Sequence, residues 1–198
     1  MSLNPEIWGA IFGDVRARSA PRTGRSVVGF RLCEVEEDED TGEFWLASTG
    51  VNHRWQPGIN RAHCSGQRRT SRGHRVPTRD CSCGLYAGRD LAKLLRVLGP
   101  PEGDVVVCGI EAGGRIVIHQ WGLRAAEAQI VAISNQLPTR VIRTVDGRIV
   151  KLLTKPAIDR GIARQLSKRY GAVLIDLAGM ADVLRGFGDF IAEEEPES

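Results

Sequence analysis

The pattern of apolar and polar residues predicts that β-strands dominate the middle of the chain. Val27–Val35 and Glu43–Ser48 are rich in β-branched and aromatic residues, and the acidic run Glu36–Asp40 separates them, so we expect a hairpin with a solvated turn. Asp104–Glu111 and Gly114–Trp121 are β-prone as well. We expect them to form a second hairpin that reverses around residues 112–114, where two glycines favour a turn.

A third hairpin is expected further along the chain. Arg140–Val145 and Arg148–Leu153 flank Asp146–Gly147, which is a favoured pair for a two-residue turn. Residues 123–133 are ambiguous, because their Ala-rich start favours a helix and their end favours a strand.

Helical spacing appears in other segments. Leu91, Leu94, Leu95 and Leu98 share one helix face, and Asp90 stands where an N-cap belongs, which predicts a helix over residues 90–98. The other expected elements are a short helix at 4–12, a loop at 13–26, a helix at 158–169 ended by Gly171, a short buried strand at 172–176 and a weaker helix at 178–192 interrupted by Gly186 and Gly188.

These elements together predict an α+β fold. We expect an antiparallel sheet, curled into a small, partly closed barrel, with a zinc-braced loop at one end and helices packed on the sheet. A mild change of composition near Pro138 suggests a zinc-loop domain over residues 1–138 and a C-terminal α/β subdomain over 139–192. The acidic residues 193–198 are expected to be a disordered tail.

Composition narrows the class of protein without naming a function. Of 198 residues, 42% are hydrophobic, which is enough for a core, and the net charge of +3 is too small to imply nucleic acid by itself. The N-terminus lacks the pattern of a signal peptide, and no run of residues is apolar enough for a membrane span, so we expect a cytoplasmic protein. The five cysteines should then be thiols, and clustered ones are suited to metal.

Cysteine and histidine cluster in the one long segment with few large apolar residues, 49–84. Cys64, His74, Cys81 and Cys83 offer the thiolate and imidazole ligands that zinc prefers in a tetrahedral site. The next residue, Gly84, permits a sharp turn of the backbone. His63 could replace His74, although neighbouring residues rarely reach the same ion. Free thiols on a polar loop are the alternative to a metal site.

We expect this zinc to be structural. A catalytic zinc keeps one position open for water, whereas four protein ligands fill the shell and three thiolates reduce the Lewis acidity of the metal. The ligand pattern of zinc deaminases is absent. The alternative is a zinc-dependent hydrolase or transferase, in which one of the four ligands lies away from the metal and a carboxylate such as Asp80 lies close to it.

The same segment is rich in arginine and has no acidic residue between positions 61 and 79. Such a loop suits contact with phosphates, and the nearby His53, Trp55 and Tyr86 suit stacking with bases. The simpler interpretation is a solvated loop in an arginine-rich protein. The candidate nucleic-acid-binding residues are Arg61, Arg68, Arg69, Arg72, Arg75 and Arg79.

Three further residues are assigned to packing rather than to chemistry. Cys33 and Cys108 lie in strand-like runs and are expected to be small core residues. His119 follows a strand, but no motif places a nucleophile near it, so we expect a packing or surface histidine.

The segment from Trp55 to Ala87 resembles a group of uncharacterised actinobacterial and actinobacteriophage proteins. The likeness rests on Trp55, Pro57 and Gly58, then Ala62 and Cys64, then His74 and Pro77, and finally Cys81, Cys83, Gly84, Tyr86 and Ala87, with a weaker match at Gly122, Arg124, Ala125 and Ala128. It implies a bacterial or phage protein and brings no activity. The sequence therefore favours a non-enzymatic, zinc-stabilised module that binds nucleic acid or, as a phage or host regulatory protein, another protein.

Overall fold

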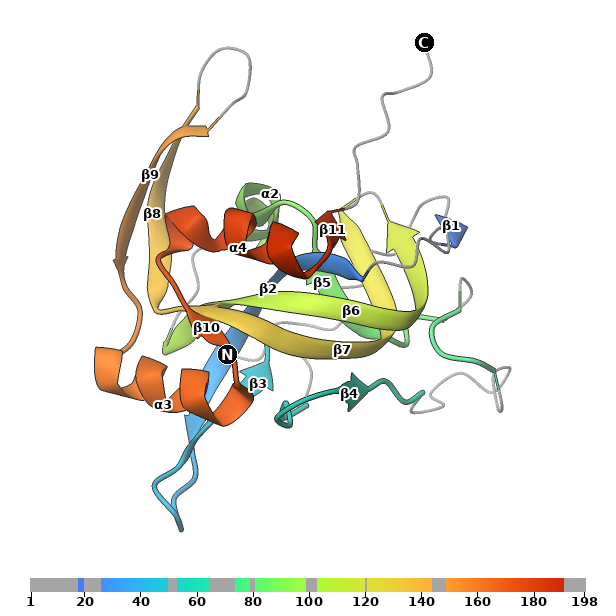
Figure 1. The fold of residues 1–198 in the computed structure, drawn as a ribbon, viewed down its shortest axis with the longest axis horizontal. Helices are drawn as coiled ribbons and strands as arrows, with labels where there is room; N and C mark the ends of the chain where they lie inside the picture. Colours follow the sequence, from blue (N-terminus) through green and yellow to red (C-terminus); the bar gives the residue numbers. More distant parts are fainter. Residues whose placement is uncertain are drawn as a thin grey trace.

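The computed structural model describes residues 18–19, 26–49, 53–64, 74–78, 81–98, 103–119, 121–143 and 149–190. Within them the fold is α+β, as expected, and its main sheet is mostly antiparallel (Figure 1). The expected helix at 4–12, most of the loop at 13–26 and the acidic tail lie outside the described residues.

The centre of the sheet is a pair of long strands, β6 (Val105–His119) and β7 (Gly122–Ser134). β6 pairs along its other edge with β2 (Val27–Glu37) and with the short β1 (Arg18–Ser19). β2 continues through the confirmed acidic turn into β3 (Phe44–Ser48). The edge of β7 that faces away from β6 pairs in turn with three short strands: β5 (Leu85–Gly88), β4 (Asn60–Arg61) and β10 (Val173–Leu174).

The pairings β2–β6, β6–β7, β7–β5 and β5–β2 connect four strands in a ring-like order. Its last contact is narrow, since β2 and β5 pair only through Phe30 and Gly88. A Cβ atom on Gly29 would lie 2.8 Å from the carbonyl oxygen of Gly88, so this close approach requires a glycine. The sheet is therefore ring-like and only partly closed.

Two apolar layers cover the sheet. On one side, Trp55, Leu46, Cys33 and Cys108 are fully buried against α3 (Arg160–Tyr170), which confirms both cysteines as core residues. On the other side, α2 (Leu91–Leu98) and α4 (Met180–Phe187) pack on the sheet through residues such as Leu94, Met180 and Leu184 (Figure 1). A separate hairpin, β8 (Gln136–Arg143) and β9 (Ile149–Pro156), extends away from the main sheet.

Caps account for the helices that the sequence predicted correctly. The Asp90 carboxylate accepts a hydrogen bond from the Lys93 amide at 2.9 Å, which is the expected N-cap of α2. Asp159 caps α3 in the same way, and Gly171 ends it in the left-handed conformation, with φ of 62°. The third hairpin is also confirmed by the β8–β9 pairing, although its turn lies outside the described residues.

Three expectations for the strands and the last helix are wrong. No hairpin reverses at residues 112–114. β6 continues through them with a bulge, because β7 pairs with β6 both before and after the bulge. The ambiguous segment 123–133 is part of a strand, β7. The expected buried strand at 172–176 is only β10, on the edge of the sheet, with Val173 43% exposed. The last helix begins after a 3₁₀ turn, η1 (Leu177–Gly179), and stops at Gly188, and β11 (Asp189–Phe190) then pairs with β2.

The expected boundary at residue 138 falls inside β8. Residues beyond it contribute β10 and β11 to the main sheet, while the division into domains stays a prediction. Among the described residues, no helix is both long enough and apolar enough to cross a membrane.

Candidate metal centre

The candidate metal loop is the connection from β4 to β5, residues 62–84. Both ends of this loop pair with the same edge of β7: Asn60 lies opposite Ala128 and Leu85 lies opposite Ala125. The two ends of the loop are therefore held next to each other, only a few residues apart along β7. Val76 is its only large aliphatic residue, so apolar burial does little to order it.

Four side chains of the loop converge on one point. The ligand atoms of Cys64, His74, Cys81 and Cys83 all lie within 4.8 Å of one another. The sulfurs of Cys64 and Cys81 are 3.7 Å apart, and Nε2 of His74 is 3.1 Å from the sulfur of Cys83. The structure thus brings together all four residues that the spacing selected.

These distances fit a metal better than a disulfide. In a tetrahedral site with ordinary zinc–sulfur bonds, two sulfurs lie about 3.8 Å apart, close to the 3.7 Å between Cys64 and Cys81. A disulfide needs roughly 2 Å, and all five cysteines are free. The cluster is therefore able to hold a metal ion. His63 is exposed and is not one of the four.

The pKa values of Cys81 and Cys83 are shifted in opposite directions. Burial and the neighbouring Cys81 raise the pKa of Cys83 to about 11. Burial also opposes ionisation of Cys81, but hydrogen bonds from Cys83 and Cys64 and the charge of Arg124 lower its pKa overall. A bound divalent cation would deprotonate all three thiols, because a coordinating thiol binds metal as thiolate.

The backbone around the cluster is shaped by Gly84 and Arg124. Gly84 has φ of 133°, and a Cβ atom there would lie 2.9 Å from Cβ of Arg124, so the predicted sharp turn after Cys83 is confirmed. On the sheet side, the buried guanidinium of Arg124 donates hydrogen bonds to carbonyl oxygens of Thr78, Cys81 and Cys83. Sequence reasoning missed this role of Arg124, which sits on β7 far from the ligands in sequence.

His119 contacts the loop indirectly, through its hydrogen bond with Arg124. It is buried rather than on the surface, and its Nε2 accepts a hydrogen bond from Nε of Arg124 at 2.7 Å. Burial and then the neighbouring guanidinium lower the pKa of His119 to about 4. The ring is therefore neutral near pH 7.

The nucleic-acid candidates are only partly described. Arg61 and Arg75 are exposed, and Arg61 forms an ion pair with Glu127 at 3.2 Å. Arg68, Arg69, Arg72 and Arg79 lie outside the described residues, as does Asp80. Within the described chain, no Asp or Glu joins the four ligands.

The expected base-stacking role of Trp55 is wrong. Its ring is fully buried, and its Nε1 donates to Oγ of Ser48 at 3.0 Å. Tyr86 is partly covered, with the Arg124 guanidinium 5.9 Å above its ring. Trp55 is thus a core residue, because the segment that carries it pairs with β3 through Leu46.

Comparisons of the chain with family models, curated proteins and solved structures gave no match. The resemblance to actinobacterial and phage proteins stays a prediction.

Proposed function

We propose that this chain is a non-enzymatic binding module in which a structural zinc ion orders the loop 62–84. The observation that carries the proposal is the convergence of one imidazole and three thiol ligands within 4.8 Å. This donor set favours zinc among common divalent ions, since calcium and magnesium prefer oxygen ligands. Three thiolate ligands also favour a reducing compartment, which supports a cytoplasmic location.

A structural role is favoured over a catalytic one by the number of ligands. Four protein ligands leave no position for water, and no carboxylate among the described residues joins the cluster. An enzyme would need one ligand to leave the metal and a base to replace it.

The proposed ligand is nucleic acid, bound through its phosphates. Cys64 and His74 hold the two ends of the segment 65–73, which carries Arg68, Arg69 and Arg72. A metal that fixes these ends reduces the entropy lost when the segment binds. Since Trp55 is buried, the support is for phosphate contacts rather than for base stacking.

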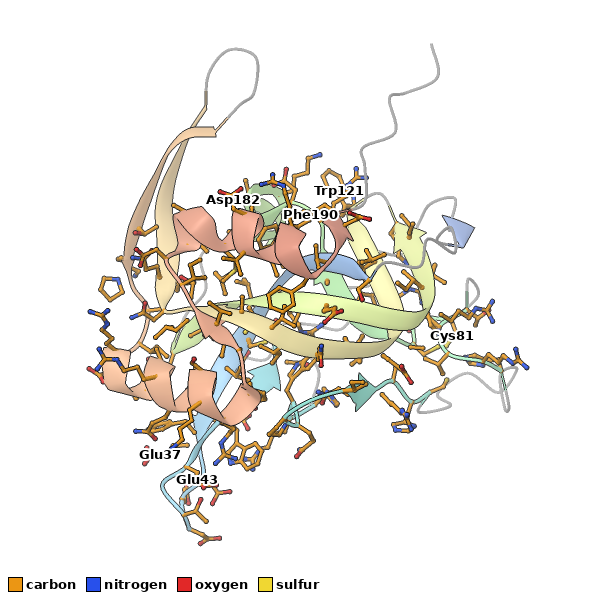
Figure 2. All side chains as sticks on the ribbon, in the orientation of Figure 1. Glu37, Glu43, Cys81, Trp121, Asp182 and Phe190 are labelled. Atoms are coloured by element: carbon orange, nitrogen blue, oxygen red, sulfur yellow. The ribbon has the colours of Figure 1, made fainter. Side chains whose placement is uncertain are left out.

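The acidic turn of the chain lies apart from the proposed phosphate-binding loop. The acidic turn between β2 and β3, near Glu37 and Glu43, lies at the bottom left of Figure 2, and Cys81 of the metal cluster lies at the right. A polyanion bound at the metal loop would therefore lie away from the acidic turn.

The test is salt-dependent binding of the purified protein to DNA and RNA. Arg68→Glu, Arg69→Glu and Arg72→Glu together should weaken binding, and each lost phosphate contact should lower the salt slope by about one. The matched control reverses Arg160, Arg164 and Lys168, which are exposed on α3, and should bind as the parent does. If the parent shows no salt-sensitive binding, or both triple variants lose affinity equally, a protein partner becomes the better hypothesis.

A further inference from the structure

Arg124 is a buried cation without a partner carboxylate in the part of the chain that the structure describes. Its side chain is 3% exposed. Its guanidinium donates to the carbonyl oxygens of Thr78 at 3.1 Å and Cys83 at 3.3 Å, to that of Cys81, and to Nε2 of His119 at 2.7 Å. All of these acceptors are neutral, and a buried charge is costly when only neutral groups surround it.

The metal site next to this guanidinium would carry an unbalanced negative charge. A divalent zinc ion with three thiolates and one neutral imidazole carries a net charge of −1. The carbonyl groups that Arg124 contacts belong to two of the cysteine ligands and to Thr78. The two unbalanced charges are therefore held close together, behind the same few peptide groups.

We infer that Arg124 is the charge partner of the zinc–thiolate cluster and, as a positioning residue, sets its affinity for metal. The inference rests on the proposed zinc site. The zinc–thiolate complex and the buried guanidinium stabilise each other, because the net charge of −1 on the complex offsets the charge of +1 on Arg124. The coupling is reciprocal: whatever Arg124 adds to zinc affinity, zinc adds to the stability of the buried guanidinium.

The geometry explains why an arginine stands here. One terminal nitrogen of its planar fork reaches Cys81 and Cys83, and the other reaches Thr78. A purely mechanical clamp would need these hydrogen bonds but not the charge. Lysine keeps the charge without the fork, and glutamine keeps a hydrogen-bond donor without the charge, so the two substitutions separate the two roles.

The test measures zinc affinity of the full chain by competition with a chelator of known affinity. Arg124→Gln should lose roughly ten- to a hundredfold in affinity, which is usual for outer groups around a metal site, and Arg124→Lys should recover most of that loss. The matched control is Arg31→Gln. Arg31 is also 3% exposed and donates to a carbonyl at 2.6 Å, but that carbonyl belongs to Tyr86, which is not a ligand. It should lower the melting temperature and leave zinc affinity unchanged.

The outcomes separate this inference from the proposed function. A parent protein that holds no zinc contradicts both. If the parent binds one zinc and Arg124→Gln binds equally well, or if Arg124→Lys loses as much as Arg124→Gln, only the charge inference is wrong. If Arg124→Gln does not fold even in excess zinc, Arg124→Lys decides: near-parental affinity supports the inference, and failure to fold overturns it.

Discussion

The metal loop and the β6–β7 hairpin lie side by side but are stabilised in different ways. Along β6 and β7, fully buried residues such as Val106, Ile133 and Leu123 are spread over both strands, and each contributes part of the apolar burial. In the described part of the loop 62–84, no aliphatic or aromatic side chain is fully buried, and we propose that the four metal ligands order it instead. In small domains, a structural zinc contributes on the order of 10 kcal/mol to folding.

This difference predicts where a single substitution has the largest effect on stability. In the hairpin, the free energy of unfolding is divided among many side chains, so one substitution removes a small share. In the loop, if zinc is bound as proposed, it is concentrated in the metal, its four ligands and Arg124. Removing one ligand should therefore affect the loop more than any single core substitution affects the sheet.

The largest expected effect comes from Cys83→Ser. Loss of one thiolate should weaken zinc binding and cost several kcal/mol of folding free energy, because binding energy of the metal is folding energy. Hydrogen exchange should show lost protection at residues 60–64 and 74–88, with residues 105–112 still protected. A strong chelator should do the same to the parent protein.

Cys108→Ala is the control for this first test, because Cys108 is a fully buried cysteine outside the cluster. Its destabilisation should not depend on chelator. Equal melting temperatures of the parent protein with and without chelator would contradict the account of the loop.

An intermediate effect is expected for Tyr170→Phe on the sheet side. The Tyr170 hydroxyl accepts a hydrogen bond from the Leu46 amide at 3.0 Å and donates one to the Trp55 carbonyl at 2.9 Å. Its loss leaves two buried backbone groups without this partner and should cost about 1–3 kcal/mol in chemical denaturation. The cost should be the same with and without chelator, and a chelator-dependent cost would show that the two regions are not independent.

The pH dependence that His119 adds is the smallest effect when it is counted per pH unit. Its pKa is about 4 in the folded state and near 6.5 when unfolded. Between these values the unfolded chain binds the extra proton, so stability falls as pH drops from about 6.5 to 4, by at most about 1.4 kcal/mol per unit. With zinc in excess, His119→Gln should flatten this slope. The exposed His63→Gln should not, and equal slopes in both variants would be evidence against the assignment.

The sequence predicted the features that depend on nearby residues. Asp90 caps the start of α2 and Gly171 caps the end of α3, as their residue types predict. The spacing of cysteines and histidine selected the four ligands. The glycines at 113 and 114 misled the prediction, because they suit a turn locally while pairing with β7 keeps the strand extended. Arg124 was missed because its role follows from a contact with Cys81, 43 residues away in the chain.

The other predictions depend on the proposal that Cys64, His74, Cys81 and Cys83 bind one zinc ion. X-ray absorption at the zinc edge of the purified protein tests it most directly. We expect one zinc per chain, with three sulfurs at about 2.3 Å and one nitrogen at about 2.0 Å. A metal-free protein, or a zinc shell with two or fewer sulfurs and added oxygen ligands, would contradict it.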